Sequence, residues 1–139
     1  MVSRVIPVDP FDLVLFGATG DLARRKILPA LFHRFQIGQF SSGCRIIGAS
    51  RSDLTAEEFR NLTADAVRSF GQDVETTPEE ITAFTTLLDY VAVDVRGAAG
   101  WDMIHGKLRD DCVRAFYLSV GPSLFPGIAR RLSETGIAT

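Results

Sequence analysis

Cysteine is scarce in this 139-residue chain, and long apolar runs are missing. Cys44 and Cys112 do not have the C-x-x-C spacing of a zinc or redox site, and reduced thiols in a cytosolic protein are the expected state. No apolar stretch approaches the roughly 20 residues of a membrane-spanning helix. Residues 1–10 also lack the apolar segment of a secretory signal. We therefore expect a cytoplasmic protein that has neither a metal site nor a membrane partner.

An excess of charge of either sign is lacking as well. The formal net charge is −2, from 15 basic and 17 acidic residues, which indicates no binding to nucleic acid or to a membrane surface. Hydrophobic residues make up 46% of the chain, which is enough for the core of one domain. We expect a single domain over residues 1–139.

Glycines, prolines and apolar runs divide the chain into alternating strands and helices. The patterns predict strands at about 12–17, 45–50, 90–95 and 113–120, and helices at about 20–36, 55–70, 77–87, 98–109 and 123–135. Thr-x-x-Glu capping boxes begin two of these helices, at Thr55 and Thr77. Gly71 ends the helix that Thr55 begins, and Gly136 ends the last helix as a typical C′ residue. Pro29 predicts a kink or a break within the first helix.

The order of these elements predicts an α/β fold. Strands that alternate with helices imply a parallel sheet with right-handed crossovers. The strand order 3-2-1-4 is expected for the first half of a Rossmann-like, doubly wound sheet. Continuous apolar character favours central positions for the first and fourth strands, whereas alternation favours a half-exposed edge position for the third. Because four strands make only half of such a sheet, we expect the chain to be a fragment of a longer protein.

The stretch from Asp12 to Lys26 is the most informative part of the sequence. A short apolar run, typical of a buried parallel strand, is followed by Gly17 and Gly20 and then by a helix. Gly17 permits a tight turn, Gly20 permits the close approach of a backbone, and the helix N-terminus favours a pyrophosphate. The spacing is G-x-x-G-x-x-A, with Ala23 in the third place, rather than G-x-G-x-x-G. In this strand–turn–helix context, the spacing predicts a dinucleotide-binding loop.

The end of the second strand carries an arginine where an NAD-binding fold usually carries Asp or Glu. The guanidinium of Arg51 could pair with a 2′-phosphate. The hydroxyls of Thr19, Ser50 and Ser52 could add hydrogen bonds. These residues predict NADP as the cofactor, while Asp53, which could accept a hydrogen bond from a ribose hydroxyl, leaves weaker use of NAD open.

The stretch Gly17-Ala-Thr-Gly-Asp-Leu-Ala-x-x-Lys26 resembles the cofactor loop of the glucose-6-phosphate dehydrogenases. Further stretches resemble this family in the same order: Lys26-Ile-Leu-Pro-Ala-Leu31, Ile47-Gly-Ala-Ser-Arg-Ser52, Val93-Asp-Val95 and Phe116-Tyr-Leu-Ser-Val-Gly-Pro122. The resemblance covers about residues 11–136. It implies NADP-dependent oxidation of glucose 6-phosphate at C1 to 6-phosphoglucono-lactone, within the pentose phosphate pathway. It also implies a homo-oligomer formed through a missing C-terminal domain.

The resemblance also implies site residues. Lys26 would contact the sugar phosphate substrate. The cofactor would be bound by Gly17, Ala18, Thr19, Gly20, Asp21, Leu22, Ser50, Arg51, Asp94, Val95, Ser119 and Val120. The family's Glu-Lys-Pro-Phe-Gly stretch and its Arg-x-Asp-His-Tyr-Leu-Gly-Lys substrate motif are absent. We therefore expect no catalytic residue and no activity in this chain alone, and we expect His33 and His105 to be exposed or hydrogen-bonded helix residues.

Other interpretations remain open at the level of the sequence. Asp21 can simply stabilise a helix N-terminus, and Asp94 can simply belong to the loop after a strand. A non-catalytic NADP-binding regulator would carry a similar loop. Extended short-chain dehydrogenases and reductases also begin Gly-Ala-Thr-Gly, but the Tyr-x-x-x-Lys pair of that group is absent, because Tyr90 and Tyr117 are followed four residues later by Asp94 and Gly121.

Overall fold

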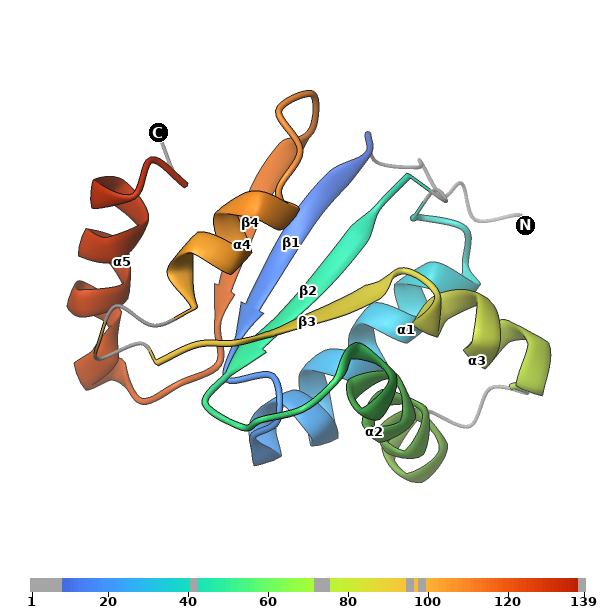
Figure 1. The fold of residues 1–139 in the computed structure, drawn as a ribbon. Coiled ribbons are helices and arrows are strands. Elements are labelled where there is room, and N and C mark those ends of the chain that lie inside the picture. Colours follow the sequence, from blue (N-terminus) through green and yellow to red (C-terminus); the bar gives the residue numbers. More distant parts are fainter. Residues whose placement is uncertain (1–8, 41–42, 72–75, 95–96, 98–99, 138–139) are drawn as a thin grey trace.

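Four parallel strands form one sheet in the order β3-β2-β1-β4 (Figure 1). The structure is a computed structural model, and it describes residues 9–40, 43–71, 76–94, 97 and 100–137. The strands are β1 (Phe11–Phe16), β2 (Arg45–Ser50), β3 (Leu88–Ala92) and β4 (Val113–Leu118). All neighbouring pairs are parallel, since the connections between consecutive strands contain helices that cross over the sheet. This arrangement confirms the predicted half of a doubly wound sheet.

Helices cover both faces of the sheet (Figure 1). One layer consists of α1 (Leu28–Gln36), α2 (Ala56–Phe70) and α3 (Pro78–Thr85), and the other of α4 (Trp101–Lys107) and α5 (Phe125–Glu134). Side chains of β1 point alternately into the two layers. Leu15 packs in the core under α1 and α2, and Phe16 packs against Trp101 of α4 at a ring-centroid distance of 5.5 Å. The apolar run therefore forms a strand buried on both faces, as predicted.

The predicted capping boxes are present at two helix starts. The Thr55 hydroxyl accepts a hydrogen bond from the Glu58 N–H (3.1 Å), and the Glu58 carboxylate accepts one from the Thr55 N–H (3.0 Å). Thr77 and Glu80 exchange the same pair of bonds at 3.2 and 3.1 Å. Gly136 follows α5 with a φ of +73°, which is the left-handed conformation expected of a C′ glycine.

The first helix departs from α-helical geometry before Pro29. A π-helical turn, η1 (Ala23–Ile27), leads directly into α1. The N–H of Leu28 donates to the carbonyl of Ala23, five residues earlier. Pro29 has no N–H to continue the helical hydrogen bonds. The sequence predicted a kink or a break at Pro29, and the irregularity is instead the π-helical turn just before it.

The edge position predicted for β3 is confirmed, but its predicted exposure is wrong. Tyr90 of β3 is only 6% exposed and packs against Phe59 of α2, while Val91 packs in the other layer, so β3 is buried on both faces rather than half-exposed. β4 ends the described half-sheet, as the predicted order requires, and Val113 and Tyr117 are 63% and 45% exposed there; its expected central position refers to the complete doubly wound sheet. Alternation in the sequence does not show which neighbouring helices cover a strand.

Several element boundaries also shift. β3 begins two residues earlier than predicted, and α4 is shorter than the predicted helix at 98–109. The last helix is preceded by a 3₁₀ turn, η2 (Pro122–Leu124), which the sequence pattern merges with α5.

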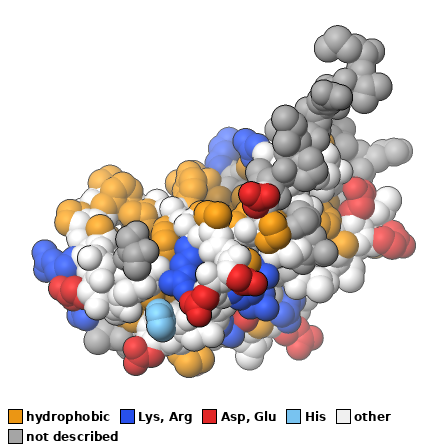
Figure 2. All heavy atoms as spheres, turned by 90° about the horizontal axis from the view of Figure 1, so that it is seen from above, with side chains coloured by type: hydrophobic (Ala, Val, Ile, Leu, Met, Phe, Trp, Pro, Cys, Tyr) orange, Lys and Arg blue, Asp and Glu red, His pale blue; other side chains and the backbone are white. Residues whose placement is uncertain are grey.

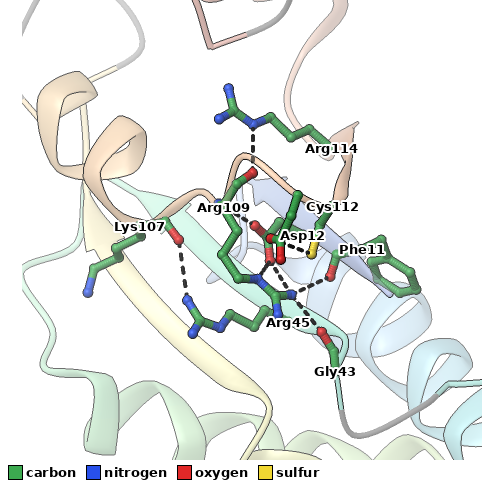
Figure 3. A network of polar contacts seen from close by, with 9 residues as sticks. Phe11, Asp12, Gly43, Arg45, Lys107, Arg109, Cys112 and Arg114 are labelled. Carbon is green, nitrogen blue, oxygen red and sulfur yellow. Dashed lines mark hydrogen bonds and ion pairs between the residues drawn. The ribbon is translucent and has the colours of Figure 1, made fainter. Parts of the chain in front are cut away.

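Arg109 joins the amino ends of the strands through a buried carboxylate (Figure 3). Asp12 of β1 is fully buried, and its Oδ1 accepts hydrogen bonds from Arg109 Nη2 (2.7 Å) and Nε (3.0 Å). The backbone N–H of Arg109 donates to Oδ2 (2.7 Å), and Nη2 also donates to the carbonyl of Gly43 just before β2 (2.6 Å). Hydrogen bonding to the Asp12 carboxylate raises the pKa of Arg109 above its ordinary value.

The face seen from above in Figure 2 carries basic and acidic side chains interspersed at its centre rather than a patch of one sign. Neither Cys44, which is buried, nor Cys112, which is half-buried, forms a disulfide within the described part of the chain. Burial is the largest of the effects that raise the pKa of Cys112.

Candidate functional site

A pocket of about 330 Å³ opens at the carboxyl ends of the strands. It is lined by Gly17, Thr19, Gly20, Ser50, Arg51, Ser52, Val93, Ser119, Val120 and Leu124. Larger hollows of about 500 and 520 Å³ lie elsewhere, the first beside His105 and Cys112 and the second between η1 and α2. The smaller pocket is the one at the point between β1 and β4 where the strand order reverses, which is where open α/β sheets bind ligands.

Gly17 forms the floor of this pocket, and no other residue fits there. Its φ is +76°, and a Cβ at this position would lie 2.0 Å from the carbonyl oxygen of Ser119. The Gly17 N–H donates to the carbonyl of Ala49 at the end of β2 (2.8 Å), so the turn is fixed between β2 and the segment after β4. Gly20 donates its N–H to the Gly17 carbonyl (3.0 Å), and a Cβ there would meet only that same oxygen, at 3.2 Å. Gly20 also lines the pocket, so its backbone is accessible to a ligand there.

Arg51 is the basic residue that lines this pocket. The residue is exposed, and among the described residues its side chain has no hydrogen-bond or ion-pair partner. A cation in this state is available to an anionic ligand without first breaking an internal ion pair. Ser50 and Ser52, on either side of it, also line the pocket.

The hydroxyls predicted to contact a cofactor are hydrogen-bonded to one another. Thr19 Oγ1 donates to Ser50 Oγ at 3.0 Å and lies 3.2 Å from Ser52 Oγ. Tyr90 joins them from β3, with its hydroxyl on Ser50 Oγ and 2.6 Å from the Ser52 carbonyl. Burial raises the pKa of Tyr90 above its ordinary value, with a smaller opposing effect from the Ser50 hydrogen bond and a further increase from the charge of Asp53. Tyr90 was not predicted as a site residue, because its place on an alternating strand does not reveal its hydroxyl partners.

Ser119 contributes a buried hydroxyl that has no partner. Its Oγ makes no hydrogen bond to any described residue, although its N–H donates to the Phe16 carbonyl (2.9 Å). Buried polar atoms are almost always paired, so an unpaired one that lines a pocket points to a ligand group that completes it. Val120, the next residue, has its Cγ1 close to Gly17 and lines the same wall.

The other predicted cofactor residues lie in varied surroundings. The Ala18 side chain is fully buried in the core, so only its backbone can face the pocket. Leu22 is 51% exposed directly after the glycine turn. The Asp21 carboxylate accepts a hydrogen bond from Arg25 Nε (2.7 Å), which ties it to the next turn of its own helix. Asp94 is half-buried, and its carbonyl accepts from the Gly97 N–H (3.1 Å); Val95 lies outside the described residues.

Lys26, the predicted substrate contact, is exposed on η1 and does not line the pocket. Its neighbours on the same turn are directed elsewhere. Arg25 lies over the ring of Phe70, 4.9 Å from the centroid, and Arg24 lines the hollow between η1 and α2. Among the described residues, Lys26 has no hydrogen-bond or ion-pair partner, so its ammonium is available to a ligand that approaches from outside the domain.

The two histidines differ from one another. His105 is exposed, as expected. His33 is half-buried, and its Nδ1 is buried without a hydrogen-bond partner among the described residues, so the expectation of an exposed or hydrogen-bonded side chain is wrong for His33.

The described ranges contain no group of three or more His, Cys, Asp or Glu side chains that could hold a metal ion. Within the same ranges, no helix is both long and apolar enough to cross a bilayer.

A glycine turn at the switch point of a parallel sheet, with an arginine directly after β2 that is unpaired among the described residues, defines a nicotinamide-dinucleotide-binding domain of the Rossmann type. The family model described as "Glucose-6-phosphate dehydrogenase, NAD binding domain" matches residues 14–139. The chain therefore belongs to the glucose-6-phosphate dehydrogenase family. The predicted cofactor, NADP, is consistent with this family.

Individual relatives agree with this assignment. The chain is 45% identical to the glucose-6-phosphate 1-dehydrogenase of Rhizobium meliloti (strain 1021) over its whole length and 38% identical to that of Gluconobacter oxydans (strain 621H) over 95% of it. The crystal structure of the Mycobacterium avium glucose-6-phosphate 1-dehydrogenase matches 90% of the chain with a TM-score of 0.81 at 26% identity. A glucose-6-phosphate dehydrogenase in complex with its substrate matches 96% with a TM-score of 0.74 at 27% identity.

The chain spans 27–29% of the length of these four proteins. The relatives are dehydrogenases, so neither the regulator nor the short-chain dehydrogenase interpretation is favoured.

Proposed function

We propose that this chain is the amino-terminal, NADP-binding domain of a longer glucose-6-phosphate dehydrogenase. The complete enzyme would transfer a hydride from C1 of glucose 6-phosphate to NADP and release 6-phosphoglucono-lactone. Arg51 lines the pocket beside Gly17 and Gly20 and is unpaired among the described residues, and this observation carries the choice of cofactor. We place the enzyme in the cytoplasm and in the pentose phosphate pathway, as a homo-oligomer assembled through residues outside this chain.

The residues of the pocket fit the parts of the cofactor. The pyrophosphate would lie at the Gly17–Gly20 turn, where the following helix begins and offers unpaired N–H groups. The 2′-phosphate would pair with Arg51. Ser119 and Val120 would line the nicotinamide ribose, and the unpaired Ser119 hydroxyl would gain a partner there. NADP supplies the hydride acceptor when bound, and the chain's contribution is orientation and charge.

The Arg51→Ala variant of the complete enzyme tests this proposal. We expect NADP affinity to fall by about 1.5–3 kcal/mol, the value of a hydrogen bond to a charged group, because the 2′-phosphate loses its cation. NAD affinity should change far less, since NAD has no 2′-phosphate. Isothermal titration calorimetry measures both, with Arg68→Ala, which removes an exposed arginine paired to Asp65 on α2, as the control. Equal losses for NADP and NAD would rule out the assignment of Arg51.

A second prediction concerns the 139-residue chain alone. We expect no turnover of glucose 6-phosphate with either cofactor, because the family's substrate motif is absent from the sequence. The absorbance of reduced nicotinamide in the presence of both ligands is the measurement, and the complete enzyme is the positive control. Measurable NADPH production by the purified chain would place the active site within these residues and contradict the proposed domain organisation.

A further inference from the structure

Tyr90 connects the edge strand of the sheet to the cofactor pocket without lining the pocket itself. Its ring is 6% exposed and packs against Phe59 of α2, with 5.3 Å between the ring centroids. Its hydroxyl extends to the end of β2 and lies 2.6 Å from the Ser52 carbonyl and 3.3 Å from the Ser50 carbonyl. The apolar packing holds the ring in place, so the position of the hydroxyl is set by the core.

The hydrogen bonds around Tyr90 follow one consistent direction. Tyr90 has one hydroxyl proton, and the short contact to the Ser52 carbonyl uses it. Ser50 must then donate its own proton to the Tyr90 oxygen, and Thr19 Oγ1 donates to Ser50 Oγ at 3.0 Å. The hydroxyls of Thr19, Ser50 and Tyr90 therefore each donate one hydrogen bond, and the last of these bonds ends at the Ser52 carbonyl. The glycine turn and the two residues that flank Arg51 are thereby tied to β3.

We propose that Tyr90 is a positioning residue for Arg51 and thereby sets the preference of the enzyme for NADP over NAD. The inference rests on the proposed function, in which Arg51 binds the 2′-phosphate. Arg51 has an exposed side chain with many rotamers. Because hydrogen bonds hold the backbone at Ser50 and Ser52, less conformational entropy is lost when the guanidinium binds a ligand. The raised pKa keeps the Tyr90 hydroxyl protonated over the working range of pH, so it remains a donor.

The Tyr90→Phe variant of the complete enzyme separates this role from a structural one. Phenylalanine keeps the ring that packs on Phe59 and removes only the hydroxyl. We expect KM for NADP to rise about tenfold, while kcat and the KM values for NAD and glucose 6-phosphate stay unchanged, because only the 2′-phosphate contact depends on Arg51. Tyr117→Phe is the matched control, since its hydroxyl has no hydrogen-bond partner in the described part of the chain and its side chain is exposed.

Arg51→Ala and the double variant complete the experiment. If Arg51→Ala leaves the NADP-to-NAD ratio of kcat/KM unchanged, the proposed binding of the 2′-phosphate fails. If Arg51→Ala lowers this ratio and Tyr90→Phe does not, the role of Tyr90 is overturned while the proposed function stands. Equal losses for both cofactors in Tyr90→Phe also overturn it, because a general structural role would have that effect. Tyr90 acts through Arg51 if adding Tyr90→Phe to Arg51→Ala changes the ratio no further.

Discussion

The Arg109→Met variant is expected to lower the free energy of unfolding by about 3–5 kcal/mol, the usual cost of breaking a buried ion pair from one side. The Asp12 carboxylate would stay fully buried, and of the donors within the described residues only the backbone N–H of residue 109 would remain. The variant would also remove the guanidinium bond to the Gly43 carbonyl, which ties the start of β2 to the same group. Urea denaturation followed by the fluorescence of Trp101, the single tryptophan of the sequence, measures the loss.

Two comparisons show whether the loss comes from the buried charge. Arg68→Met breaks an exposed pair with Asp65 and is expected to cost less than about 1 kcal/mol. The double variant Asp12→Leu with Arg109→Met should recover much of the stability, because no carboxylate is then left without a partner in the core. A loss below about 1 kcal/mol in Arg109→Met would contradict the importance assigned to this pair.

Lys26→Ala in the complete enzyme is expected to lower kcat/KM for glucose 6-phosphate by about two orders of magnitude, because a bound phosphate loses a charged partner. NADP affinity should be nearly unchanged, since Lys26 does not line the cofactor pocket. Lys26→Arg should also be a poor enzyme, because a broad planar guanidinium does not replace a compact ammonium. Steady-state kinetics with both substrates varied measures these effects.

Arg24→Ala is the control for Lys26→Ala. Arg24 is an exposed cation on the same π-helical turn, but it lines the hollow against α2. If Lys26→Ala keeps the kcat/KM of the unchanged enzyme, Lys26 has no role in substrate binding. If Arg24→Ala loses as much as Lys26→Ala, the effect of Lys26 is a general positive potential and not a contact.

Local signals in the sequence predicted much of the fold. The capping boxes at Thr55 and Thr77 involve groups three residues apart, so the sequence contains all their partners. Gly17 and Gly136 take the left-handed conformations expected of a tight turn and of a helix end. The position of the pocket followed from the strand order and the glycine turn, because the carboxyl ends of parallel strands meet at one edge of the sheet.

Contacts between distant segments were not predictable in the same way. Tyr90 and Ser50 are 40 positions apart, and nothing near either residue indicates that their hydroxyls meet. That the buried Ser119 hydroxyl has no partner among the described residues could be recognised only from the packing around it. The π-helical turn lies just before Pro29, and the sequence does not show whether a helix near a proline bends or forms such a widened turn.

The pairing of β1 with β4 brings together residues that are very far apart in the chain, since Asp12 of β1 lies opposite Arg114 of β4, 102 positions later. Closing so long a loop costs conformational entropy before its contacts can form, whereas the connections from β1 to β2 and from β2 to β3 are much shorter. The β1–β2–β3 part is therefore expected to assemble first during folding, and β4 to dock last. Ser119 and Val120 arrive with β4, so the cofactor pocket gains its second wall only in this final step. On the proposed function, a dinucleotide that binds between the glycine turn and Ser119 would therefore stabilise the sheet with β4 docked.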